Sequence, residues 1–403
     1  MDIKDKLAFY KSNVPKAESI PNTNIPSSVK ALANEFRAEI CRPAAPYLKI
    51  RRYYDLNENI MESDNQTKVD LTFLNKGLSE SRFKLEETVF FDLETTGLMG
   101  GTGTFPFLLG FAAVKNNQIK IDQYFLPDFG REFYAYKALN EFFPAYKNLV
   151  SFNGKSYDYP LLNSRYIMNH LKPAFSNMHH FDLLHMARRV WKDALPACDL
   201  ISIEQNVLHR YRSGDIPGWL IPQSYFDFLN TGVIHNVIQI IEHNFYDIIS
   251  LVELVLALDK ISNHPENESN VNVLTRLANE AYHQDNLERF EQICNTIEKI
   301  AGRIRPELLI FKSILHKRRR DWNKAVLIWE TLSESGQHAF FALEELAKFH
   351  EHQRKNYQLA MTYTTRALKA FDLYIQLEKY TPDYDSIHLK FRQRYNRLKS
   401  KLA

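Results

Sequence analysis

The chain has 403 residues, 45% of them hydrophobic and 25% charged, and its formal net charge is +3. The length predicts two or three domains, the composition is that of a soluble globular protein, and so small a net charge does not by itself predict a nucleic-acid partner. No apolar run approaches the ~18 residues that span a bilayer, and the first residues lack the apolar core of a signal peptide. The three cysteines form no CxxC pair, which argues against a zinc site or a disulfide framework. We therefore expect a cytoplasmic protein without membrane contact.

Residues 1–85 predict a partly ordered N-terminal extension. A polar, proline-containing start precedes a predicted helix near 28–40, a predicted strand at 47–54 and a polar loop at 57–68.

Residues 86–260 predict an α/β domain. The patterns predict strands at 88–93, 107–114, 119–126 and 149–152, a helix at 132–146 before the last of these, and mostly helix from 158 to 260. This order predicts a mixed sheet, which we expect to have five strands, with flanking helices.

The segment 261–270 predicts a linker, and residues 271–403 predict an all-α domain. Asn286, Asp321 and Asn356 are each 35 residues apart and have the character of helix N-caps. A period of about 34 residues with paired helices is typical of a tetratricopeptide-like array. The alternative is a generic helical bundle.

Two basic clusters are candidates for contacts with phosphate groups. One is the run 317–320, and the other is formed by Lys390, Arg392, Arg394, Arg397, Lys399 and Lys401 near the end of the chain. Each could equally be a solvated helix face.

Acidic residues stand where the pattern predicts burial. Asp92 and Glu94 alternate at the end of a predicted strand, so their side chains point to one face. Unpaired buried carboxylates are costly, and a divalent cation is a common remedy. A strand end that meets solvent is the alternative.

Two further segments add candidates. Asp158 follows a predicted strand and begins a predicted helix, and His243 and Asp247 lie four residues apart on a strongly apolar helix. This spacing places the last two on one helix face. The alternative for that pair is a helix cap and a core histidine.

These motifs together are specific. The sequence resembles the DEDD (DnaQ-like) exonuclease superfamily in three motifs. They are D-x-E followed by T-T-G at 92–97, N-x-x-x-Y-D at 153–158 and H-N-F-Y-D at 243–247. The middle motif is most similar to proofreading domains of family B polymerases. Over about residues 87–260 the sequence resembles the bacterial YprB-like ribonuclease-H-like proteins still more closely. That family implies a ribonuclease-H-like fold and commonly carries C-terminal tetratricopeptide-like repeats.

The resemblance also implies roles. Asp92, Glu94, Asp158 and Asp247 match the four metal-binding acids, which would hold two Mg²⁺ or Mn²⁺ ions about 3.5–4 Å apart. Thr95, Thr96, Gly97 and Asn153 match positions that contact the terminal nucleotide. Gly100, Gly101 and Gly103 would let the backbone approach a phosphate.

The general base departs from the family pattern. The two known subclasses place Tyr four residues, or His five residues, before the last acid, whereas here His243 stands at the Tyr spacing and Glu242 at the His spacing. His243 could orient the attacking water or take its proton, or it could be structural or contact the substrate. Asp182 could support a metal ligand, cap a helix or have no function, and we favour the cap.

We therefore predict a metal-dependent 3′→5′ exonuclease that acts on single-stranded DNA or RNA. The alternative is a catalytically silent nuclease fold that binds nucleic acid or acts as a scaffold through its helical repeats. A structure-specific endonuclease with the same site is a third possibility. The repeats are the candidate site for a partner protein.

Overall fold

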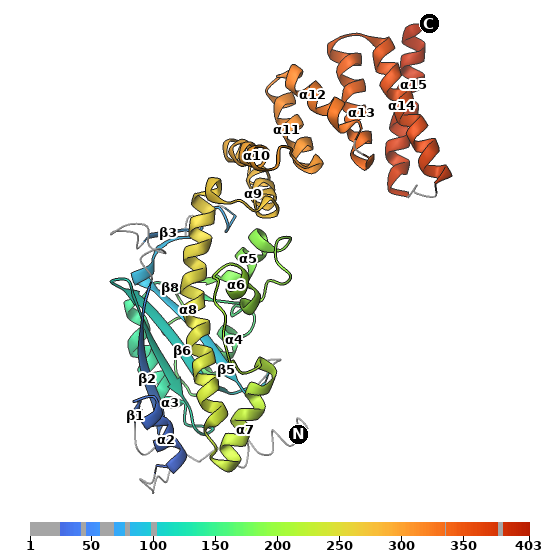
Figure 1. Ribbon diagram of the computed structural model, residues 1–403. Coiled ribbons are helices and arrows are strands. Elements are labelled where there is room, and N and C mark those ends of the chain that lie inside the picture. The colour runs from blue at the N-terminus through green and yellow to red at the C-terminus, as the bar shows by residue number, and fades with distance from the viewer. Residues whose placement is uncertain are drawn as a thin grey trace. The chain divides into compact units, whose positions relative to one another are not determined.

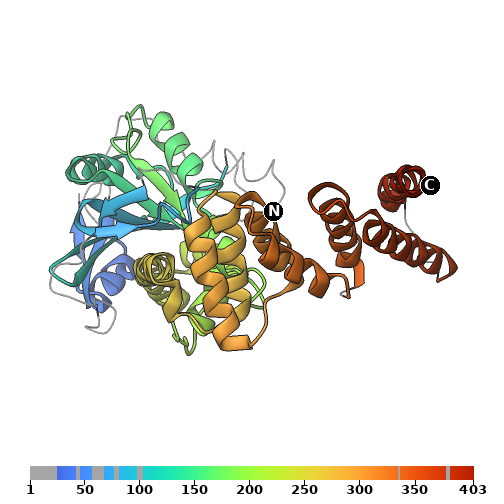
Figure 2. The same ribbon diagram turned by 90° about the horizontal axis from the view of Figure 1, so that it is seen from above.

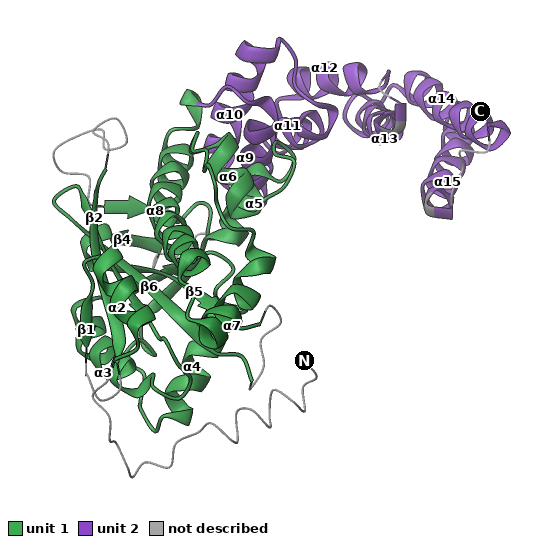
Figure 3. Ribbon diagram, turned by 60° about the horizontal axis from the view of Figure 1, so that its bottom comes forward, with its two compact units in different colours: residues 1–267 green, residues 268–403 purple. Residues whose placement is uncertain are grey.

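The computed structural model describes residues 25–41, 46–56, 68–76, 81–97, 103–334, 336–377 and 382–403. The chain divides into two compact units, residues 1–267 and 268–403 (Figure 3). Gly100, Gly101 and all but the last residue of the predicted loop at 57–68 lie outside the described residues.

The first unit is built on a seven-stranded sheet with the strand order β1-β2-β7-β6-β5-β8-β9. The strands are β1 (Glu39–Cys41), β2 (Tyr47–Asp55), β5 (Thr88–Thr95), β6 (Pro106–Lys115), β7 (Gln118–Phe125), β8 (Asn148–Ser151) and β9 (His179–Asp182). Strands β5, β6 and β7 are antiparallel neighbours, and β8 and β9 run parallel to β5. A small second sheet pairs β3 (Lys68–Asp70) with β4 (Arg82–Lys84). The predicted mixed sheet is confirmed.

The strand count differs from the five expected. Strands β1 and β2 extend the sheet along the edge of β7, so the described part of the N-terminal segment joins the same sheet. The helix predicted near 28–40 ends at Glu35, because Arg37 adopts a left-handed φ of 49° before the chain enters β1. The prediction of mostly helix from residue 158 to 260 is confirmed, but it missed β9, whose four residues are too few to show a strand period.

Helices cover both faces of the sheet. They are α2 (Ser27–Glu35), α3 (Phe133–Phe142), α4 (Asp158–Met168), α5 (Leu183–Trp191), α6 (Leu200–Asn206), α7 (Ile221–Thr231) and α8 (His235–Asn263). Helix α8 packs across β5, β6 and β7, and α3 lies on the other face (Figures 1 and 2). The chain over α8 contains no glycine or proline and is largely apolar, which favours a long buried helix.

An arginine of the N-terminal segment joins β2 to α8. The Arg52 guanidinium lies 3.6 Å from the centroid of the Phe245 ring and 2.6 Å from a Glu242 carboxylate oxygen. It also donates to Gln123 on β7. These contacts fix the position of α8 over the sheet. In the part of the chain that the structure describes, no helix is both long and apolar enough to cross a membrane.

The second unit is all helical. Its helices are α9 (Val271–His283), α10 (Leu287–Ala301), α11 (Pro306–Arg318), α12 (Trp322–Leu332), α13 (Ala339–Lys348), α14 (Tyr357–Gln376) and α15 (Asp385–Leu402). A π-helical turn, Phe349–Gln353, follows α13. Helices α9 with α10, α11 with α12 and α13 with α14 pack as consecutive pairs.

The turn inside each pair repeats. Asn286, Asp321 and Asn356 are the N-caps of α10, α12 and α14, and each side chain accepts a hydrogen bond from the backbone N–H three residues on. The residue before each cap has a left-handed backbone: φ is 56° at Asp285, 59° at Arg320 and 55° at Lys355. The predicted N-caps are therefore confirmed, and the same turn recurs every 35 residues.

Most residues of the two basic clusters have acidic partners within the second unit. Lys317 pairs with Glu345, Arg318 with Asp285 and Arg319 with Glu291. On α15, Arg394, Arg397 and Lys401 all contact Glu351, whose side chain is fully buried. These cations stabilise helix contacts, which weakens the case for phosphate binding by the clusters.

Candidate metal centre

Strand β5 presents the first two acids to α8. Asp92 and Glu94 alternate along β5 and share a face of the sheet, and Glu94 is buried. The register with β6 shifts between Glu94 and Thr95, so the strand becomes irregular directly after the acids. Burial and the charges of neighbouring carboxylates, Asp247 among them, raise the pKa of both side chains well above the ordinary value.

The third acid begins α4. Asp158 follows a loop whose backbone N–H groups at Asn153 and Lys155 donate to the two carboxylate oxygens of Asp182, at 2.8 and 3.1 Å. Asp182 also accepts from the N–H of Leu184 and so caps α5, as predicted. Burial, and then the charge of Asp182, raise the pKa of Asp158 to about 7. The loop is thus held in place by a residue of β9.

Glycine permits the close turn of this loop. Asn153 has a left-handed φ of 61°. A Cβ at Gly154 would lie 2.4 Å from Oγ of Ser151 and 3.2 Å from a carboxylate oxygen of Asp158. A side chain at residue 154 would therefore clash with Ser151 and crowd the carboxylate of Asp158.

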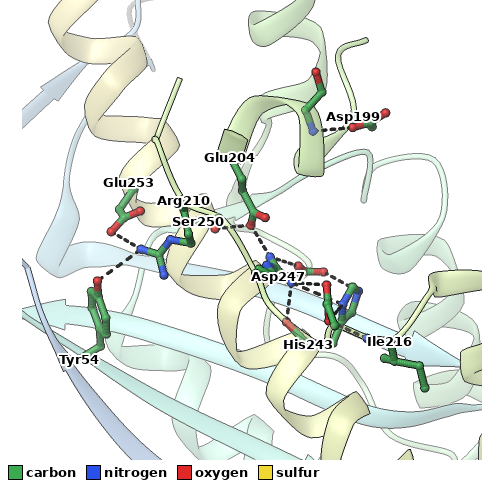
Figure 4. A network of polar contacts seen from close by, with 12 residues as sticks. Tyr54, Asp199, Glu204, Arg210, Ile216, His243, Asp247, Ser250 and Glu253 are labelled. Atoms are coloured by element: carbon green, nitrogen blue, oxygen red, sulfur yellow. Dashed lines mark hydrogen bonds and ion pairs between the residues drawn. The ribbon is translucent and has the colours of Figure 1, made fainter. Parts of the chain in front are cut away.

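Helix α8 supplies the last acid and the histidine on one face (Figure 4). Nε2 of His243 lies 3.4 Å from Oδ2 of Asp247, and Nδ1 lies 2.8 Å from Oδ1 of Asp215. Burial disfavours the charged imidazole, but the hydrogen bond to Asp215 and the charge of Asp247 outweigh it and raise the pKa of His243 to about 9. The imidazole therefore joins two acids from separate segments.

The sequence analysis missed Asp215 and its neighbour Arg212, which lie in the segment between α6 and α7. The Arg212 guanidinium lies 2.5 Å from Oδ1 of Asp247 and also contacts Glu204, which is buried on α6. Ser250 of α8 donates a second hydrogen bond to Glu204 (Figure 4). Burial disfavours the charge on Arg212, but Asp247 and Glu204 raise its pKa. The segment carries none of the three DEDD motifs, and only its contacts in the fold show that Asp215 and Arg212 belong to the site.

All four acids and His243 line one cleft of about 260 Å³. The other predicted residues that line it are Thr95 and Gly97. Thr96 and Asn153 are not part of the lining: Thr96 is buried and exchanges hydrogen bonds with the backbone of Phe105. Gly103 is described but has open space around it. The remaining wall is formed by Leu93, Thr104, Tyr157, Leu161, Gly218, Ile221 and Pro222.

The donor set fits a divalent cation. Ligand atoms of Glu94, His243 and Asp247 lie within 4.8 Å of one another, which is close enough to share one ion. Asp92 and Asp158 add carboxylates to the same cleft, and burial together with the charges of Asp247 and Asp158 raises the pKa of Asp92, a rise that a bound cation would oppose. Carboxylate oxygens are the ligands that Mg²⁺ and Mn²⁺ prefer.

The fold and the acid-lined cleft define a nuclease domain of the RNase H superfamily, and the model of that superfamily matches residues 89–258. The chain is also 31% identical over 319 residues to the uncharacterized protein YprB of Bacillus subtilis (strain 168), over 77% of this chain and 75% of that protein. The chain belongs to the YprB family of RNase-H-like proteins, as the sequence motifs indicated.

Proposed function

We propose that this protein is a divalent-metal-dependent exonuclease that removes nucleotides from the 3′ end of single-stranded DNA or RNA. One observation carries the proposal. Four acids from three separate segments, β5, the start of α4 and the middle of α8, meet in one cleft together with His243. Folding alone gives no reason to gather four carboxylates in one cleft, where burial and the charges of Asp247 and Asp158 raise the pKa of both Asp92 and Glu94.

Asp92, Glu94, Asp158 and Asp247 would hold the cations, which we propose to be two Mg²⁺ or Mn²⁺ ions. When bound, they would supply activation of the attacking water and neutralise charge at the leaving 3′ oxygen. The protein contributes a rigid frame, because each acid sits at a fixed point of a strand or helix.

His243 has the geometry to hold the attacking water at Nε2. Its Nδ1 is engaged by Asp215 at 2.8 Å, so Nε2 is the nitrogen that faces Asp247 and the cleft. Arg212 donates to Oδ1, the other oxygen of Asp247, and so fixes that carboxylate. Asp215 and Arg212 thus restrict the motion of the His243 and Asp247 side chains, which the reaction needs in fixed positions.

The cleft wall favours an unpaired strand. Tyr157 lines the cleft next to Asp158 and is 50% exposed, so we propose that its ring stacks on a base of the bound strand. Stacking tolerates any base, which suits a nuclease without sequence preference. Thr95 and Gly97 lie at the same wall and are proposed to contact the terminal nucleotide.

The test is digestion of 5′-labelled single-stranded DNA and RNA with Mg²⁺ or Mn²⁺, compared with a variant that carries Asp92→Ala and Asp158→Ala. We expect a ladder that shortens from the 3′ end, absent from the variant and in EDTA. Asp199→Asn is a matched control, because Asp199 caps α6 and is not part of the cleft.

A circular single strand separates the alternatives. Cleavage of the circle would replace the exonuclease proposal with an endonuclease. No cleavage of any substrate by the folded protein in either metal would favour a catalytically silent binding module.

For the second unit we propose a tetratricopeptide-like role in binding a partner protein. The supporting observation is the capped, left-handed turn that recurs every 35 residues. Loss of a captured partner on deletion of residues 271–403 would support this proposal.

A further inference from the structure

A fully buried amide lies directly behind the acids. Asn244 on α8 has no exposed surface, and its Nδ2 donates to Oδ2 of Asp92 at 2.8 Å and to the Asp92 backbone oxygen at 3.2 Å. Asn244 stands three residues before Asp247, so the same part of α8 carries an acid of the cleft and a donor to another acid.

The orientation of this amide is set by a second one. Nε2 of Gln123 on β7 donates to Oδ1 of Asn244 at 2.8 Å and to the backbone oxygen of Ile241 at 2.9 Å, and Gln123 is also fully buried. Because Oδ1 is the acceptor of this bond, the NH₂ group of Asn244 has to face Asp92.

A glycine makes room for the contact. Gly110 on β6 pairs with Asp92 across the sheet, and a Cβ there would lie 2.2 Å from Oδ1 of Asn244 and 2.3 Å from Cδ1 of Ile248. Any other residue at 110 would push the amide away. Four elements, β5, β6, β7 and α8, thus combine to place one hydrogen bond on one carboxylate.

We propose that Asn244 is a positioning residue for the metal centre, which holds the Asp92 carboxylate in the orientation that binds the cation, with Gln123 fixing the amide of Asn244. This inference rests on the proposed function, since it assumes that Asp92 is a metal ligand. Groups that orient a metal ligand typically change metal affinity by about 10–100-fold when they are removed.

A bonded amide also limits the cost of burying Asp92. Without it, Asp92 would face Asp158 and Asp247 with no fixed rotamer. The carboxylate would then have to be ordered by the cation itself, at the expense of binding free energy.

The experiment measures Mn²⁺ binding to the full-length chain by isothermal titration calorimetry after removal of metal with EDTA. The variants are Asn244→Leu, which is close in volume, and Gln123→Met, which frees the amide to turn. Asn148→Leu is the matched control. Asn148 is a buried asparagine of the same sheet, on β8, and its Nδ2 donates to Oγ1 of Thr88. Thermal unfolding in EDTA confirms that each protein is folded.

We expect the Kd for Mn²⁺ to rise about 10–100-fold in Asn244→Leu and by a smaller factor in Gln123→Met. Asn148→Leu should keep the wild-type Kd even where it loses as much thermal stability. If Asn244→Leu does not fold, the Kd of Gln123→Met for Mn²⁺ tests the proposal by itself.

Wild-type Kd values in both folded variants would overturn the positioning role and leave the metal centre intact. A wild-type protein that binds no Mn²⁺ would refute the metal centre and the positioning role together. Weaker binding in the variants supports the inference even if no nuclease activity is found, because calorimetry does not depend on cleavage.

Discussion

Nδ1 of His243 lies 2.8 Å from Oδ1 of Asp215, while Nε2 of the same ring lies 3.4 Å from Oδ2 of Asp247. The imidazole is therefore held between Asp215, which lies outside the three DEDD motifs, and Asp247, which lies inside one of them. This arrangement gives a physical account of the unusual spacing, since a histidine at this position has a partner that orients it.

Asp215→Asn should lower kcat for single-stranded oligonucleotides by about 10²-fold or more and leave KM nearly unchanged. The Asn amide can donate from its NH₂ group to Nδ1 of His243, which favours the tautomer with the proton on Nε2. Nε2 would then no longer be free to accept a hydrogen bond from the water. Steady-state kinetics check this, with Asp199→Asn as the control. A wild-type kcat in Asp215→Asn would mean that Asp215 has no part in the reaction.

Arg212→Met should destabilise the metal-free protein by about 3–5 kcal/mol, because it leaves the buried carboxylate of Glu204 without its cation. Adding Glu204→Gln should recover much of this loss, since the amide can keep the hydrogen bond from Ser250 without a charge. Urea unfolding in EDTA measures both effects. Simple additivity of the two substitutions would show that the side chains do not interact.

In EDTA, stability should fall as the pH rises from about 4 to above 7. The pKa of Asp158 is raised from 3.8 to about 7, and those of Asp92 and Glu94 are raised as well, so the folded state binds more protons than the unfolded state in this window. Stability then decreases with pH.

Thermal unfolding at pH 5.5 and pH 8 checks this expectation. Other groups also titrate, so the comparison is with Asp92→Asn/Asp158→Asn, which should depend less on pH. Mn²⁺ at pH 8 should raise the Tm of the wild type, since a ligand at ~100 times its Kd adds about 2.7 kcal/mol. An identical pH dependence in the variant would contradict the coupling of the acids.

Glu351→Gln should lower the thermal stability of the helical unit at pH 7. Hydrogen bonds from Arg397 and Lys401 hold the pKa of Glu351 at about 2, below its ordinary value of 4.5. This contribution is complete above pH 4.5 and is lost as the pH falls through about 2.

The difference in Tm between the wild type and Glu351→Gln should therefore shrink in acid, as followed by circular dichroism. Glu334→Gln is the control, because Glu334 pairs with Arg366 while 72% exposed, and such pairs contribute about 0–1 kcal/mol. Equal losses in the two variants would show that burial of Glu351 does not matter.

The sequence predicted the elements whose patterns repeat within a few residues. Alternation placed Asp92 and Glu94 on one face of β5, and a four-residue spacing placed His243 and Asp247 on one face of α8. The N-caps of the second unit followed from their spacing of 35 residues. Such features depend on local geometry, which a short stretch of chain determines by itself.

Only the tertiary structure revealed the partners that hold these residues. Asn244 lies 152 residues from Asp92 and 121 residues from Gln123, and Arg212 lies 35 residues from Asp247. The addition of β2 to the sheet likewise depends on a pairing with β7 across more than 60 residues. Periodicity carries no information about such distant contacts, because they form only when the whole core packs. The sequence alone therefore predicted the acids and the histidine that meet in the cleft, and the packed core decided the rest of its wall and the neighbours that orient them.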